Sequence, residues 1–146
     1  MAHAMTRDQM LEIAERHARV EARRQIDPLM ATLSSDPLYE FPTVGRVLRG
    51  RERIRRHYIQ FFEDYMSRIT DGRRLGQWAD GERFVLESEL IVRGAEGLER
   101  HRVLSVFWAA GNKIGGERIY ASESVVRQMA GVMFDELEPE DPVRVP

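Results

Sequence analysis

Hydrophobic residues in the N-terminal third of the chain recur at the spacing of amphipathic helices. A first helix is predicted to open at a capping box over residues 6–9 and to run to about Ile26. Its apolar stripe consists of Met10, Ile13, Ala14, His17 and Val20. The Asp-Pro pair at residues 27–28 predicts the start of a short second helix. A third helix is expected over residues 51–66. Its apolar side is formed by Ile54, Tyr58, Phe61, Phe62 and Tyr65.

Most of the remaining chain has the two-residue alternation of strands. The expected strands cover residues 38–41, 44–48, 67–78, 82–93, 98–109 and 114–121. Turn pairs such as Asp80-Gly81 predict hairpins between the later strands, and Ser122 predicts the cap of a last helix. Helices followed by strands predict an α+β fold. We expect a curved antiparallel sheet of five to six strands wrapped around three helices, with an extra C-terminal helix and an enclosed pocket.

Composition narrows the possible partners. The 146 residues fit one domain, expected over residues 5–134, with residues 1–4 as a cloning remnant and residues 135–146 as an acidic, proline-rich tail that frays. A net charge of −2 gives no basic surface for nucleic acid. We find no signal peptide, no stretch apolar enough to cross a bilayer and no cysteine. A cytoplasmic protein without membrane contact, disulfides or thiolate metal sites is therefore expected.

Three segments, in their order and spacing, resemble the nuclear-transport-factor-two-like superfamily, specifically its SnoaL-like and ketosteroid-isomerase-like branch. They are residues 35–42, the helix start Gly50-Arg51-Glu52-x-Ile54 with Tyr58, and residues 117–129. The resemblance covers residues 11–131 and implies a cystatin-like cone. Because this superfamily includes isomerases, cyclases, dehydratases, epoxide hydrolases and non-enzymatic adaptors, the resemblance does not give a function.

The catalytic pattern of the ketosteroid isomerases is not kept. The position of that family's general-base aspartate is Phe41, its protonated aspartic acid falls on Ser105, and its tyrosine donor falls on His17. The supporting tyrosine of the third helix is kept as Tyr58. The aspartate that SnoaL-like cyclases carry after the last strand is replaced by Ser122, and the Arg-Asp pair of limonene-epoxide-hydrolase-like enzymes has no equivalent. Steroid isomerisation by the family's mechanism is therefore not expected.

His17 is the leading candidate for a catalytic residue, because its apolar helical neighbours predict that it points into the cone. Histidine transfers protons near neutrality. The alternative is a core histidine satisfied by Tyr58 or a backbone carbonyl. Glu117 is the second candidate. The resemblance places its side of the last strand on the cavity face, where burial would raise the pKa of its carboxyl and suit it to act as a general base. The alternative is an ion pair with an arginine on the neighbouring strand. His101 is expected near the cavity mouth, as a second acid/base or a rim residue.

Other residues are expected on the pocket wall or on the outer face of the sheet. The substrate-binding wall is predicted to contain Tyr39, Phe41, Phe61, Val103, Ser105, Phe107 and Ile119. Glu87 and Glu89 should lie on the outer face, opposite arginines of neighbouring strands. These arginines are Arg100, Arg102 and Arg118. The arginine-rich run 46–56 is typical of a solvated face rather than an anion site. No metal site is expected, because the histidines lack ligand spacing.

We therefore expect a small cofactor-independent enzyme that performs isomerisation, cyclisation or dehydration on a hydrophobic, cyclic or polyketide-like molecule. In this hypothesis His17 moves the proton, Glu117 or His101 partners it, and Tyr58 orients it. The alternative is a non-catalytic ligand-binding or dimeric adaptor domain. An open pocket with two or more converging titratable groups favours the enzyme, and a collapsed cavity favours the adaptor. An apolar outer sheet face also predicts a homodimer. This face contains Val85, Ile91, Leu104, Val106 and Trp108.

Overall fold

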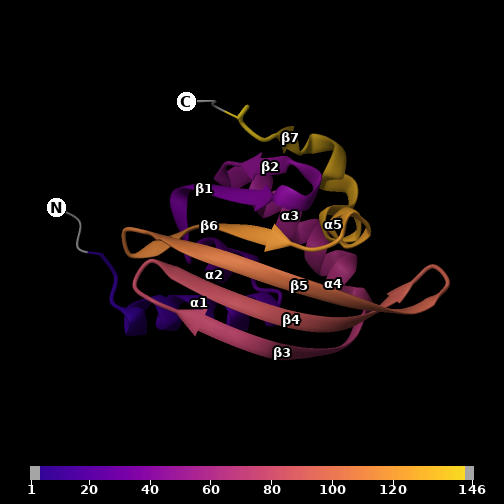
Figure 1. Ribbon diagram of the computed structural model, residues 1–146, viewed down its shortest axis with the longest axis horizontal. Helices are drawn as coiled ribbons and strands as arrows, with labels where there is room; N and C mark the ends of the chain where they lie inside the picture. Colours follow the sequence, from indigo (N-terminus) through magenta and orange to yellow (C-terminus); the bar gives the residue numbers. More distant parts are fainter. Residues whose placement is uncertain (1–3, 144–146) are drawn as a thin grey trace.

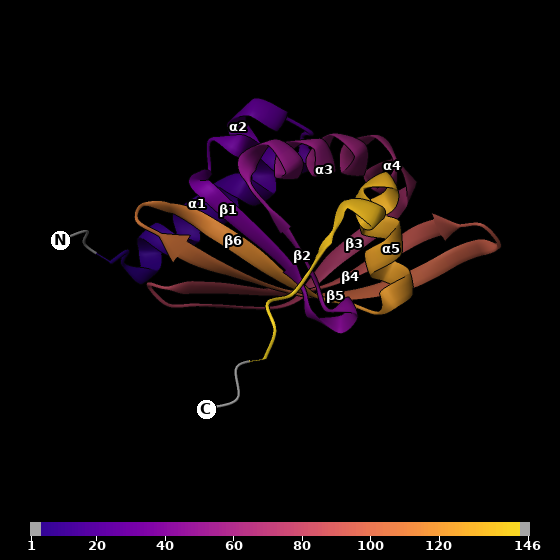
Figure 2. The same ribbon diagram turned by 90° about the horizontal axis from the view of Figure 1, so that it is seen from above.

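The computed structural model describes residues 4–143. The strands are β1 (Leu33–Phe41), β2 (Arg46–Arg49), β3 (Ile69–Ala79), β4 (Arg83–Gly94), β5 (Gly97–Ala110), β6 (Lys113–Tyr120) and β7 (Glu138–Pro139). The α helices are α1 (Arg7–Ala22), α2 (Ile26–Met30), α3 (Arg51–Glu63), α4 (Tyr65–Arg68) and α5 (Glu123–Ala130). The sheet curves, and α1 to α4 lie on one of its sides (Figures 1 and 2). The predicted α+β fold, a curved sheet wrapped around helices, is confirmed.

Two features of the sheet differ from the expected five or six antiparallel strands. Within the described residues the order is β3-β4-β5-β6-β1-β2-β7, so the two-residue β7 adds a seventh strand. β1 and β6 pair in parallel, with Tyr39 beside Glu117, whereas the other pairs are antiparallel. β1 also begins earlier than expected, and its register is irregular between Leu33 and Leu38. Pro37 lies in this stretch and has no N–H to give to a ladder.

The first helix begins as expected but ends early. Thr6 and Gln9 form the capping box: the Gln9 N–H donates to Thr6 Oγ1 at 3.1 Å, and the Thr6 N–H donates to Gln9 Oε1 at 2.8 Å. Arg24 follows α1 with left-handed backbone (φ 55°), so the helix does not continue towards Ile26. The pair 27–28 lies within the first turn of α2, where a proline loses no hydrogen bond. No helix within residues 4–143 is long and apolar enough to span a membrane.

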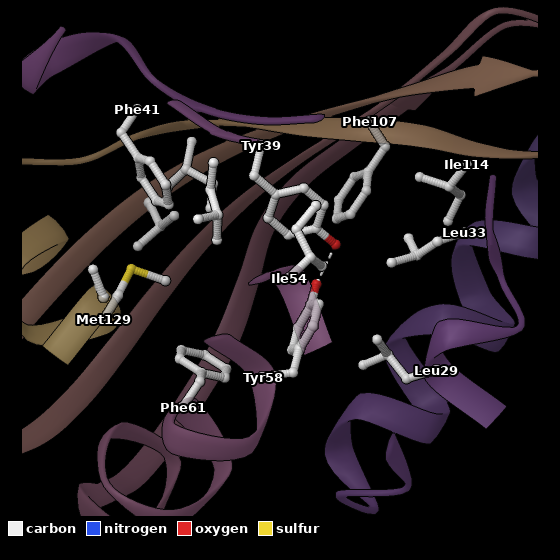
Figure 3. Close-up of a cluster of buried hydrophobic side chains, with 14 of the residues drawn as sticks. Leu29, Leu33, Tyr39, Phe41, Ile54, Tyr58, Phe61, Phe107, Ile114 and Met129 are labelled. Carbon is white, nitrogen blue, oxygen red and sulfur yellow. Dashed lines mark hydrogen bonds between the residues drawn. The ribbon is translucent and has the colours of Figure 1, made fainter. Parts of the chain in front are cut away.

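The hydrophobic core lies between the inner side of the sheet and the helices (Figure 3). Strand residues in this core include Leu33, Tyr39, Phe41, Phe107 and Ile114. Helix residues in the same core include Leu29, Ile54, Tyr58, Phe61 and Met129. The apolar stripe predicted for α1, His17 included, is buried. The small side chains Ala14, Ala18 and Ala22 of α1 leave open space beside β4 and β5, and this space is the cavity described below.

The outer face carries the predicted charge ladder in part. Glu89 is only 7% exposed, and its carboxylate is 2.8 Å from Arg102 and 3.5 Å from Arg100. Burial alone would raise the pKa of Glu89, but the hydrogen bond from Arg102 and the surrounding guanidinium charges lower it below its usual value. The expected place of Arg118 in this ladder is wrong. Parallel pairing puts Arg118 beside Glu40, with which it forms an ion pair at 2.5 Å.

Residues 135–141 of the acidic tail contact the rest of the domain, which the composition of the tail did not predict. Leu137 is buried, and β7 pairs with β2. The tail carboxylates contact the arginine-rich run, which is therefore partly covered rather than solvated. The pairs are Glu136 with Arg56, Glu138 with Arg53 and Asp141 with Arg49. Residues 144–146 of the tail, and residues 1–3 of the expected cloning remnant, lie outside the described range.

Candidate active site

A cavity of about 260 Å³ lies between α1, α5 and the inner side of β4, β5 and β6. Its polar side chains are His17, Glu21, Ser88, Ser105 and Glu117. The rest of the wall is apolar: Ala14, Ala18, Ala22, Phe61, Met66, Ile69, Phe84, Leu86, Leu90, Val103, Phe107 and Met129. A larger hollow of about 510 Å³ lies beside Glu40 and Arg118, but these two already pair with each other. An apolar cavity with a few converging polar groups is the usual form of a small-molecule site.

His17 lies on the α1 wall of this cavity and is only 1% exposed. Its Nδ1 is 2.8 Å from the Thr32 hydroxyl oxygen. Its Nε2 is 3.2 Å from the Tyr58 hydroxyl and 3.3 Å from a carboxylate oxygen of Glu21, one turn along the same helix. Nε2 therefore lies between Glu21, which lines the cavity, and Tyr58, which belongs to the core.

The hydrogen-bond directions fix the tautomer of the neutral His17 ring. The Thr32 hydroxyl donates its proton to the Leu29 carbonyl oxygen at 2.6 Å. The Thr32 oxygen can then only accept from His17, so Nδ1 of the neutral ring carries the hydrogen. Nε2 keeps its lone pair, as a general base requires.

Two tyrosines extend this chain of hydrogen bonds into the core. The hydroxyls of Tyr39 and Tyr58 point towards each other and are hydrogen-bonded (Figure 3). Both side chains are buried, and burial raises the pKa of both hydroxyls well above the usual value, so they stay protonated. With Nε2 of His17 as the acceptor, Tyr58 donates to it and Tyr39 donates to Tyr58. Tyr58 therefore contacts His17 as predicted.

Glu117 lies on the β6 wall of the cavity, and its side chain faces the interior as predicted. It is 8% exposed, and burial raises the pKa of its carboxyl to about 8, with a further increase from the negative charge of Glu21. A hydrogen bond with Ser105 on β5 acts in the opposite direction but is the smaller effect. The alternative of an arginine partner on the neighbouring strand is not found: among the described residues, the groups that act on the Glu117 carboxyl are Glu21 and Ser105. Glu117 is thus mainly a neutral carboxylic acid at pH 7.

The structure does not bring all the predicted site residues to the cavity. Those on its wall are His17, Phe61, Val103, Ser105, Phe107 and Glu117. Tyr39, Phe41, Tyr58 and Ile119 are buried in the core but do not line the cavity.

His101 does not lie at the cavity mouth. It is 2% exposed, its Nδ1 is 2.7 Å from the Tyr65 hydroxyl, and its Nε2 is 3.2 Å from Glu99. The Tyr65 ring from α4 stacks on the imidazole, with ring centroids 5.7 Å apart. Strand alternation correctly placed His101 on the inner face, but it could not show that Tyr65 covers this position. The interpretation of His101 as a partner of His17 has no support in this geometry.

Two residues that contact His17, Glu21 and Thr32, were not predicted from the sequence. Glu21 was detectable, since a carboxylate four residues after a helical histidine lies on the same face. Thr32 follows α2, and no local pattern connects it with a histidine fifteen positions earlier. Among residues 4–143, no three histidine or carboxylate side chains gather in a way that could hold a metal ion.

The fold and the cavity define a small α+β domain in which a curved sheet and the helices enclose a mainly apolar space. A family model for the SnoaL-like domain matches residues 14–115, and the chain belongs to this family. No curated protein matches the chain.

Solved structures share the fold at low sequence identity. A hypothetical protein with a ketosteroid isomerase-like fold from Catenulispora acidiphila DSM 44928, in complex with trimethylamine, is 18% identical, with a TM-score of 0.63 over 82% of this chain and 92% of that chain. PrhC from Penicillium brasilianum NBRC 6234 is 9% identical, with a TM-score of 0.66 over 90% and 97%. A de novo designed protein with a curved β-sheet is 16% identical, with a TM-score of 0.67 over 86% and 97%. These likenesses support the fold and do not assign an activity.

Proposed function

We propose that this SnoaL-like protein is a small cofactor-independent enzyme that moves protons on a hydrophobic molecule bound in the cavity. The observation that carries the proposal is that His17 and Glu117 line the same cavity from different walls, one as a potential base and the other as a neutral acid. Two titratable groups held in different protonation states are typical of an acid/base pair. The reaction class is isomerisation, cyclisation or dehydration.

In this mechanism Nε2 of His17 removes a proton from a carbon of the substrate. The substrate replaces the Tyr58 hydroxyl at this nitrogen, and Tyr58 keeps its hydrogen bond to Tyr39. The imidazolium that forms is stabilised by the Glu21 carboxylate, 3.3 Å from Nε2. Thr32 holds the ring in place throughout through Nδ1.

In this mechanism Glu117 is a hydrogen-bond donor to the substrate, rather than the general base expected from the sequence. As a neutral acid it donates a hydrogen bond to the substrate oxygen on which negative charge develops, and so stabilises the intermediate. Ser105 occupies the position that the resemblance assigns to a protonated aspartic acid, and Glu117, on the next strand, interacts with its hydroxyl. The neutral acid is thus supplied by β6 instead of β5. Return of the proton from the His17 imidazolium to a different carbon gives an isomer. Transfer of the same proton to a hydroxyl group, which leaves as water with the electron pair of its carbon–oxygen bond while the electron pair of the deprotonated carbon forms the new carbon–carbon double bond, gives a dehydrated product.

One observation favours the alternative of a non-catalytic ligand-binding domain. Within the described residues, every fully buried side-chain nitrogen or oxygen has a hydrogen-bond partner, so the His17 chain is satisfied without a substrate. A satisfied histidine would serve stability alone. The two functions differ in whether Nε2 of His17 gives up its hydrogen bond from Tyr58 and removes a proton from the bound molecule.

Carbon–hydrogen exchange tests this difference without knowledge of the natural reaction. A panel of small cyclic ketones is incubated with the protein in D₂O, and deuterium incorporation beside the carbonyl is followed by NMR. We expect exchange that falls about 10²–10⁴-fold in His17→Phe, the usual contribution of a positioned base. Glu87→Gln, on the outer face, is the control and should leave the rate unchanged. Binding of ketones without exchange, or equal exchange in His17→Phe, would contradict the proposed enzyme.

A further inference from the structure

Within the described residues, the cavity wall contains two acidic side chains but no lysine or arginine. The chain contains 22 lysine and arginine residues. None of them is among the described residues that line the cavity. The titratable groups on its wall are His17, Glu21 and Glu117, and the two tyrosine hydroxyls behind His17 are held protonated. An anionic ligand would therefore meet two carboxyl groups and no basic residue other than a histidine.

Glu21 is the group that carries negative charge at this site. Its side chain is 30% exposed at the end of α1, and its contact in the cavity is Nε2 of His17. In the neutral ring the hydrogen is on Nδ1, which donates to Thr32, so Nε2 has no hydrogen. The neutral ring therefore offers no positive charge to Glu21. Glu117 lies deeper and is mainly neutral at pH 7. The cavity thus has a charged oxygen near its solvent side and a neutral acid at depth.

The rest of the wall suits the body of an apolar cation. Phe61, Phe84 and Phe107 face the same space, and the rings of Phe84 and Phe107 lie 5.9 Å apart. Aromatic faces attract cations that have left water, and they also pack well against hydrocarbon. A carboxylate that lines the same cavity as three aromatic rings, with no lysine or arginine among the described residues of the wall, is an arrangement that selects ammonium groups.

We propose that the ligand class of this cavity is a protonated amine on a compact apolar body, with its ammonium group held by Glu21 beside the phenylalanine rings. This inference rests on the proposed function, because it takes the cavity beside His17 as the substrate site. It also deepens that function. His17 contacts Oε2 of Glu21, so Oε1 is the oxygen proposed for the ammonium. Glu117 is left free to contact a second polar group of the substrate, and carboxylate and phosphate compounds are expected to bind least.

Three probes of the same size and shape test the charge preference. They are benzylamine, which is a cation at pH 7, benzyl alcohol, which is neutral, and benzoate, which is an anion. Dissociation constants are measured by NMR titration of the full chain, so that weak binding is detected. We expect benzylamine to bind about tenfold more tightly than benzyl alcohol, as one partly screened charge contact allows, and benzoate to bind least.

A matched pair of variants assigns the preference to Glu21. Glu21→Gln should bring benzylamine to the affinity of benzyl alcohol. Glu12→Gln removes the same charge from the same helix, but Glu12 is exposed and does not line the cavity, so the preference should remain. If Glu21→Gln does not fold, the wild-type comparison of the three probes still decides the question.

Equal binding of benzylamine and benzyl alcohol by the wild type, no binding of benzylamine, or a preference that survives in Glu21→Gln would each overturn the inference. These measurements involve no turnover. Selective binding of the amine without exchange of ketone protons would contradict the proposed enzyme and support the amine site. His17-dependent exchange with no charge preference would do the reverse.

Discussion

Glu117 should make the protein less stable as the pH rises, and replacement by glutamine should remove this dependence. Burial raises the pKa of its carboxyl from the usual 4.5 to about 8 in the folded protein. Below pH 4.5 the carboxyl is protonated in both the folded and the unfolded chain, so it has no effect. Between the two values only the unfolded chain loses the proton, and each pH unit then shifts the folding equilibrium tenfold towards the unfolded state.

The size of this effect follows from the same two values. Folding is penalised by roughly 3 kcal/mol at pH 7, and the penalty reaches its full size above pH 8. Glu117→Gln keeps a polar group of the same shape beside Ser105 but does not ionise. Urea unfolding of both proteins at pH 4.5, 6, 7 and 8.5 measures the difference, since other ionisable groups contribute equally to both. The stability gained by the variant should grow steadily with pH. A difference that does not change between pH 4.5 and 8.5 would refute the protonated state of Glu117.

Two further predictions concern the support of His17 and the outer face of the sheet. Thr32→Val should lower the free energy of unfolding by about 1–3 kcal/mol, because Nδ1 of His17 is left buried without its acceptor; urea unfolding checks this, and an unchanged stability would show that Thr32 does not hold the ring. The chain should also be a homodimer that pairs through the outer sheet face, and sedimentation equilibrium showing a monomer at micromolar concentration would contradict that. The residues proposed for this interface are Val85, Ile91, Leu104, Val106 and Trp108.

Local periodicity was enough to predict the faces of most elements. The stripe of α1 placed His17 inside the cone, and alternation placed Glu89 on the outer face of β4. For Glu117, alternation grouped it with Ile119 and Ala121, and the family resemblance placed this group on the inner face of β6. These predictions succeed because a helix or strand that covers one core must keep its apolar side on that core. The pairing of Tyr58 with His17 required the family resemblance in addition, since the two residues lie on different helices.

Features that depend on contacts between distant segments could not be predicted in this way. The parallel pairing of β1 with β6 removed Arg118 from the expected ladder, and Tyr65 covered His101. The tail has the composition of a frayed segment, but its carboxylates neutralise an arginine run about 80 positions earlier, and Leu137 anchors it in the core. Periodicity describes one element at a time, so it contains no information on which charges meet across the fold.

The state of the His17 ring is the most direct test of the proposed acid/base site. Long-range ¹H–¹⁵N correlation spectra of ¹⁵N-labelled protein identify which ring nitrogen carries the hydrogen in the neutral form, and His17→Phe assigns the signals by their loss. The structure predicts hydrogen on Nδ1, held by Thr32, and a lone pair on Nε2, beside Glu21. A neutral ring with its hydrogen on Nε2 would leave no base facing the cavity and would contradict the account.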